Sequence, residues 1–338
     1  MGDEHIQWID GAKAIAIIAV LVDHLHGVVY SNNIIWMSSF FSVTVFVLLA
    51  GITSYISNTR HENDRVIDQV LRKVKALVFP YVAATLFYHI ASSHRFDLVD
   101  YLEHLIRFDI TEPFYFIVFY LQLSIIGIFL YRIIKHTKYE ILIACIALFI
   151  SAMCVKYTYI LPVWGGGQFL FGGSYLFIYT IGLILAKKRK TIKINNIKIL
   201  FWGIGLVAYS IIYIKHGFYF DMKLGEPFGN GLNPPGITLM LYSILVFIFI
   251  YYLINNMQNA NVFFTKKVIA ILCIIGQNSY YIFLYHRLVL DYFLSGIQIN
   301  NIWLCRVIYS ILMIGVPIII KFIFESIKKK YNMLMRGE

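Results

Sequence analysis

Long apolar runs separated by short polar connections make up most of the chain. The runs lie near residues 12–30, 34–56, 75–92, 114–134, 139–156, 163–185, 199–214, 237–254, 268–292 and 302–324. Most of them approach the roughly 20 residues that cross a bilayer as a helix. A spanning segment must satisfy its own backbone N–H and C=O groups, and the period-two alternation of a membrane barrel is absent. The pattern therefore predicts an all-α fold, a polytopic transmembrane helix bundle of about ten spans.

Lys and Arg residues are distributed unevenly over the connections between these runs. If the N-terminus lies in the cytoplasm and the runs alternate in direction, 20 of the 29 Lys and Arg residues fall in inner loops and the C-terminal tail, and five fall in outer loops. Cytoplasmic loops of membrane proteins carry such an excess. The distribution therefore predicts that both termini are cytoplasmic, in a multi-pass protein of the cell (plasma) membrane.

Two of the predicted outer connections are long. Residues 93–113 place apolar and charged positions with helical periodicity, which predicts a short helix lying on the outer surface. Residues 215–236 are rich in Gly, Pro and aromatic residues, which predicts an ordered loop.

Composition agrees with the membrane assignment. Apolar residues make up 59% of the chain and charged residues only 14%, whereas soluble domains are about a quarter charged. Because the spans occupy most of the length, residues 1–338 are expected to form a single transmembrane domain without an appended soluble domain. The net charge of +11 is explained by the inner loops, so no nucleic-acid partner is expected. The four cysteines lie in apolar runs without metal-ligand spacing, which predicts no metal site.

The first run carries three ionisable residues, Lys13, Asp23 and His24. Lys13 and His24 are 11 residues apart, which is about three helical turns with roughly 20° of residual rotation, so they share one face about 16 Å apart. Ionisable groups inside a membrane are costly and commonly functional. This register favours a functional imidazole deep in the bundle. The alternatives are a snorkelling Lys13 and a His24 that only hydrogen-bonds a neighbouring helix.

Several motifs follow one another in an order that resembles a known family. They are Ile9-Asp10-Gly11; Lys13, ten residues, then His24; FFSVTVFVLLAGITSY at 40–55; Arg72-Lys73-Val74-Lys75 followed by Phe79-Pro80-Tyr81; Glu112 to Phe116; and IGQNSYYIFLYHRLVL at 275–290. Together they resemble the acyltransferase-3 family of integral membrane O-acyltransferases, and within it the fucose 4-O-acetylase-like branch. Most members carry Arg where this chain has Lys13. The Arg guanidinium can form two parallel hydrogen bonds with one phosphate or carboxylate, whereas the Lys ammonium acts as a single compact charge.

The resemblance implies an O-acetyltransferase acting on glycans. Acetyl-CoA would be the cytoplasmic donor substrate, with no bound cofactor, and the acceptor would be a hydroxyl of a cell-surface polysaccharide (capsule, exopolysaccharide or another envelope glycan) or of its lipid-linked precursor. His24, with Lys13, would be the catalytic residue, either as a base or as an acyl-imidazole. Arg72, Lys73 and Lys75 would bind the CoA phosphates; the alternative for them is an ordinary positive inner loop.

Four further residues are candidates for supporting or acceptor-binding roles. Asp23 points about 100° away from His24 around the helix, so we expect it to pair with a cation on another helix, Arg306 or Arg287. His286, next to Arg287, would bind the acceptor or support the base, with a hydrogen-bonded core histidine as the alternative.

Rival functions also follow from the sequence. They are a transporter or flippase of lipid-linked sugars, a structural membrane scaffold, and transfer of another acyl group such as succinyl. The lack of a visible internal repeat speaks mildly against transport.

Overall fold

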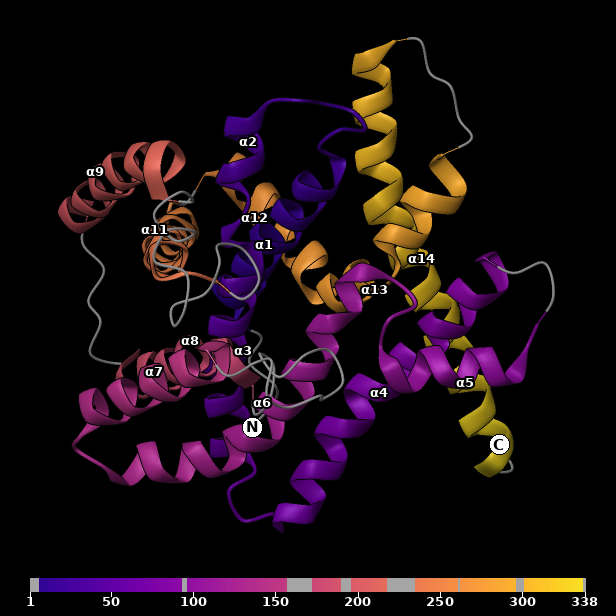
Figure 1. Ribbon diagram of the computed structural model, residues 1–338, viewed down its shortest axis with the longest axis horizontal. Helices are drawn as coiled ribbons and strands as arrows, with labels where there is room; N and C mark the ends of the chain where they lie inside the picture. Colours follow the sequence, from indigo (N-terminus) through magenta and orange to yellow (C-terminus); the bar gives the residue numbers. More distant parts are fainter. Residues whose placement is uncertain are drawn as a thin grey trace.

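The computed structural model describes residues 6–92, 96–156, 172–189, 196–217, 235–260, 262–295 and 301–336 (Figure 1). Its elements are α1 (Gln7–Leu25), α2 (Asn33–Ser38), α3 (Phe41–Arg60), α4 (Val66–Ser92), α5 (Leu98–Arg107), the 3-10 turn η1 (Glu112–Phe114), α6 (Tyr115–His136), α7 (Glu140–Lys156), α8 (Leu176–Lys188), α9 (Asn196–Ile212), the π-helical η4 (Tyr213–Gly217), α11 (Ile237–Asn259), α12 (Phe263–Gln277), α13 (Ser279–Leu288), the π-helical η5 (Val289–Leu294) and α14 (Ile302–Arg336). The described residues form no β-strand, so the all-helical prediction is confirmed.

Within these ranges, five helical stretches are long and apolar enough to cross a membrane. They are Asn33–Arg60, Val66–Ser92, Glu112–His136, Ile237–Asn259 and Trp303–Ile327, and α12 with α13 and η5 makes a sixth if that bent pair is one span. The chain is therefore a multi-pass membrane protein. The number of ten spans and the cytoplasmic termini stay predictions, as does the plasma membrane.

Helix α1 lies inside the bundle and contacts α3, α11, α12 and α13, whereas α9 and α14 lie on opposite sides of the molecule (Figure 1). Small residues let other helices approach closely. A Cβ added to Gly276 of α12 would lie 1.9 Å from the backbone oxygen of Asp10 in α1, and one added to Gly182 of α8 would lie 2.2 Å from that of Leu48 in α3. Only glycine fits at these two positions. The contact of Gly276 with Asp10 sets the axial position of α1 relative to α12.

The ninth predicted span, 268–292, is not continuous. It divides into α12 and α13, which meet at Asn278 with a bend of 68°. The side-chain amide of Asn278 donates to Ile274 O at 2.6 Å, and Lys321 Nζ of α14 donates to Asn278 Oδ1 at 2.9 Å. These side chains provide polar partners at the break, a condition for bending a helix inside a membrane. The sequence marks the break only by the stretch from Gly276 to Ser279 within the apolar run.

The short helix predicted within 93–113 is confirmed as α5, and its place on the outer surface stays a prediction. Asp97 caps it by accepting from Val99 N at 2.8 Å. Tyr81 and Tyr101 attach it to α4, because Tyr81 OH donates to Leu105 O at 2.8 Å and Tyr101 OH donates to Val82 O at 3.2 Å. The predicted ordered loop at 215–236 falls mostly on residues 218–234, which lie outside the described residues.

The Gly182 contact yields a stability prediction. Gly182→Ala forces the α3 and α8 backbones apart and should destabilise the protein by about 1–3 kcal/mol, as overpacking does. Thermal unfolding of the purified protein in detergent measures the change. Gly315→Ala in α14 is the matched control, because a Cβ there meets nothing within 4 Å, and it should leave stability unchanged or slightly higher. Equal melting temperatures for the two variants would contradict the proposed backbone contact.

Candidate functional site

Two histidines from distant parts of the chain meet inside the bundle. The ring centroids of His24 (α1) and His286 (α13) are 5.0 Å apart, with the planes at 40°. His286 is fully buried, and its Nδ1 lies 2.7 Å from Phe283 O. Because a carbonyl only accepts, Nδ1 carries the proton, which leaves Nε2 as the basic nitrogen. Among the described residues that buried Nε2 has no hydrogen-bond partner, so the pair contains an uncommitted proton acceptor.

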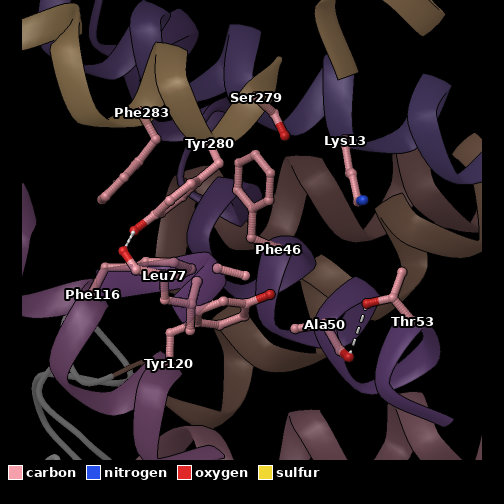
Figure 2. Close-up of a pocket in the computed structure, with 11 residues that line it drawn as sticks. Lys13, Phe46, Ala50, Thr53, Leu77, Phe116, Tyr120, Ser279, Tyr280 and Phe283 are labelled. Carbon is pink, nitrogen blue, oxygen red and sulfur yellow. Dashed lines mark hydrogen bonds between the residues drawn. The ribbon is translucent and has the colours of Figure 1, made fainter. Parts of the chain in front are cut away.

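A cavity of about 260 Å³ lies beside Lys13, between α1, α3, α4, α6 and α13 (Figure 2). We call it the inner cavity; it is lined by Lys13, Phe46, Ala50, Thr53, Ala76, Leu77, Phe116, Tyr120, Ser279, Tyr280 and Phe283. The polar ends of Lys13, Ser279 and Tyr120 face the same space in Figure 2. No hydrogen bond or ion pair holds the Lys13 ammonium within the part of the chain that the structure describes.

Phe283 connects the inner cavity to the histidines. Its ring lies 5.0 Å from that of Phe116, which also lines the cavity, and 6.0 Å from that of His286. Phe283 therefore lines the inner cavity and lies beside His286, and Lys13, which also lines the cavity, is on the same helix as His24. The sequence relates Lys13 and His24 by register alone, whereas the structure places a cavity beside Lys13.

A second cavity, of about 370 Å³, lies at the junction of α5 and α6. We call it the outer cavity, after the side that the predicted topology gives it; it is lined by Arg107, Phe108, Asp109, Thr111, Glu112, Tyr115 and Val118. The start of α6 is the wall between the two cavities, since Phe116 faces the inner one and Tyr115 the outer one. The charge of Asp23, the residue before His24, interacts with Glu112 and Tyr115. Sequence reasoning did not single out Glu112 or Tyr115 as site residues.

Asp23 has a different partner from the one expected. Trp36 Nε1 of α2 donates to Asp23 Oδ1 at 2.7 Å, and the Trp36 ring stacks on His26 with centroids 4.6 Å apart. The expected pairing with Arg306 or Arg287 is therefore wrong. The reason is that α2 folds back over the end of α1 and brings an indole N–H to the carboxylate, an uncharged donor that a search for cations misses.

The two arginines are used elsewhere. Arg287 Nε lies 3.1 Å from Asp291 Oδ2, one turn further along the chain. Arg306 Nε donates to Val29 O at 3.2 Å, and its guanidinium lies 4.9 Å from the centre of the Trp303 ring. Arg306 thus holds the connection that follows α1, and Arg287 stays beside His286.

The three basic residues predicted to bind CoA point to different neighbours. Arg72 Nη1 donates to Asp64 Oδ2 at 2.9 Å, and this hydrogen bond holds the pKa of the Asp64 carboxyl below its usual value. Lys73 Nζ donates to Ser54 Oγ at 3.0 Å, while Lys75 is exposed. Lys73 lies one turn before Ala76 on α4, which lines the inner cavity. Lys73 therefore lies on the same face of α4 as Ala76 of the cavity lining.

The structure is thus that of an all-helical membrane protein that holds a polar site, the His24–His286 pair, inside its helix bundle. A family model described as an acyltransferase domain matches residues 6–322. The chain therefore belongs to the acyltransferase-3 family, and it is a membrane acyltransferase. No curated protein and no solved structure matches it.

The Asp23–Trp36 contact can be tested directly. Trp36→Phe keeps an aromatic ring against His26 but removes the only N–H of the side chain, leaving a part-buried carboxylate without its donor. We expect a loss of about 1–3 kcal/mol of stability, measured by thermal unfolding in detergent. Trp303→Phe is the control, because Trp303 is 71% exposed. A Trp36→Phe protein as stable as that control would show that the hydrogen bond is unimportant.

Proposed function

We propose that the protein is an O-acetyltransferase of the fucose 4-O-acetylase-like branch. It moves an acetyl group from cytoplasmic acetyl-CoA to a hydroxyl of an extracytoplasmic cell-surface polysaccharide or of its lipid-linked precursor. The observation that carries the proposal is the His24–His286 pair with one uncommitted nitrogen. It lies beside Phe283 of the inner cavity, and Asp23, next to His24, interacts with Glu112 of the outer cavity. Transfer to a hydroxyl needs a base that works near neutral pH, and imidazole is the side chain suited to it.

The donor must be held from the inner side. Acetyl-CoA is polyanionic, so its nucleotide end stays among the basic residues Arg72, Lys73 and Lys75 while its long arm enters the inner cavity. Lys13 lines that cavity and has no hydrogen bond among the described residues, with Asp10 as the nearby opposite charge, and its ammonium can bind a polar group of the arm. The acyl end then reaches past Phe283 to the histidine pair. This assigns Lys13 to holding the donor and His24 to the chemistry.

The chemical step follows from the position of the imidazoles. His24 removes the proton of the acceptor hydroxyl, the oxygen attacks the thioester carbonyl carbon, and the C–S bond breaks. CoA leaves as a thiolate and takes the proton from His24. His286 Nε2 accepts the other N–H of His24 and orients its ring, a role that carboxylates have in hydrolase triads. An acyl-imidazole on His24, formed first and then attacked by the acceptor, gives the same products.

A transporter or flippase of lipid-linked sugars is the second candidate, because broken helices near the middle of the membrane are typical of transporters. In those folds the breaks come in pairs related by an internal repeat. Among the described residues a single pair of helices, α12 with α13 and η5, is bent in this way. A flippase would move the sugar lipid without adding an ester, so ester analysis separates the two candidates.

Removing the proposed base should abolish activity while leaving the protein in place. His24→Ala should reach the membrane at normal abundance and lower O-acetylation of the surface glycan by at least about 100-fold, the scale of general-base catalysis. Proton NMR of the isolated glycan measures the ester. His136→Ala, at the far end of α6, is the matched control. Persistent esterification by His24→Ala, in cells without another such enzyme, would exclude His24 as the catalytic residue.

Lys13 should affect the donor and not the acceptor. Lys13→Ala should raise the KM for acetyl-CoA about tenfold, the effect of losing one charge-assisted hydrogen bond, and leave the KM for the acceptor unchanged. Lys13→Arg keeps the charge and should stay close to the original enzyme. Initial rates in detergent with each substrate varied in turn provide the measurement. An unchanged KM for acetyl-CoA in Lys13→Ala would remove Lys13 from the donor site.

A further inference from the structure

We infer that the outer cavity binds the acceptor sugar and selects uncharged sugars over those that carry a carboxylate or a phosphate. This inference rests on the proposed function and adds the class of acceptor to it. The position of the cavity, the pairing of its charged residues and the chemistry of its walls support it.

The position of the outer cavity suits an acceptor. Tyr115 and Phe116 are adjacent residues that face the outer and the inner cavity respectively. Phe116 contacts Phe283, which contacts His286. A hydroxyl entering beside Tyr115 therefore approaches the histidine pair from the side opposite the donor.

The charges that line the outer cavity are unequally paired. Arg107 Nη2 lies 2.8 Å from Glu103 Oε1, so the cation is already neutralised within α5. Asp109 Oδ1 lies 2.7 Å from His104 Nδ1. In the described ranges no cation pairs with Glu112, and the charge of Asp23 acts on it from α1. The uncommitted charge that a ligand meets here is therefore negative.

An ionised carboxylate only accepts hydrogen bonds, and sugar hydroxyls are the donors that match it. A carboxylate or phosphate on the sugar would instead face Glu112, and like charges brought together reduce binding. The aromatic walls add a second element of selection, since the faces of Phe108 and Tyr115 can cover the apolar face of a sugar ring. Phe108 is held in place by stacking on Tyr81, with centroids 4.7 Å apart.

The test is an acceptor series with the purified full-length protein and acetyl-CoA. Methyl glycosides of glucose, galactose and fucose are compared with the methyl glycosides of glucuronate and galacturonate, and kcat/KM is measured for each. The original protein should acetylate its preferred neutral glycoside at least tenfold better than the uronate of the same or nearest configuration. Glu112→Gln should narrow that ratio to threefold or less, and Glu112→Lys should reverse it, both without a change in the KM for acetyl-CoA.

Glu62→Gln is the matched control. Glu62 pairs with Lys135 and lines neither the inner nor the outer cavity, so this variant should keep the original ratio. Equal use of neutral and uronate glycosides, or a ratio that Glu112→Gln and Glu112→Lys leave unchanged, overturns the inference while esters still form and the proposed function stands. Failure to form an ester on any glycoside contradicts the proposed function and the inference together.

Discussion

A helix can bend sharply inside a bilayer only where its freed backbone groups find new partners, and the rest of the site depends on this condition being met at Asn278. The Asn278 amide donates to the carbonyl of Ile274, and Lys321 from the last helix holds the other end of the amide. With these partners α13 turns away from α12 by 68°. The turn carries His286 to His24, and it brings Ser279, Tyr280 and Phe283 to the inner cavity.

The close contact between α1 and α12 also determines how His24 meets His286, because it sets the position of α1. Gly276 has no side chain to separate its backbone from that of Asp10, so α1 lies directly against the helix that precedes the break. The register of α1 then decides which residues meet the cavities. Lys13 faces the inner cavity, and His24, three turns later, meets His286. The packing of α1 therefore places Lys13 at the inner cavity and His24 beside His286.

Hydropathy and the positions of charged residues were enough to predict the all-helical membrane fold and the short helix α5. Both follow from the length and spacing of apolar residues along the chain, which are local properties of the sequence. The motif order was enough to predict the family. The run from 268 to 292 was predicted as one span although Gly276, Gln277, Asn278 and Ser279 interrupt its apolar residues. The bend at Asn278 also depends on Lys321, which is distant in the chain. Asp23 was expected to meet a cation, and its indole partner depends on how α2 folds back. The outer cavity joins residues from the end of α5 and the start of α6, and no spacing rule points to Glu112.

These features describe a membrane acyltransferase whose proposed chemistry lies between two compartments. The basic inner side suits a polyanionic donor, and the carboxylates of the outer cavity suit a hydroxyl acceptor without negative charge. In the proposed reaction the donor and the acceptor meet at the histidine pair. Neither substrate then has to cross the membrane, because only the acetyl group changes sides.

Reconstitution in sealed liposomes tests this central claim most directly. Acetyl-CoA labelled in the acetyl group is supplied only on the side of the basic loops, and a neutral methyl glycoside is confined to the opposite compartment. The account predicts that labelled ester appears on the glycoside in the compartment that never held acetyl-CoA, and that His24→Ala abolishes it. Ester formed only when both substrates share one compartment, or glycoside that crosses the bilayer unmodified, would contradict it.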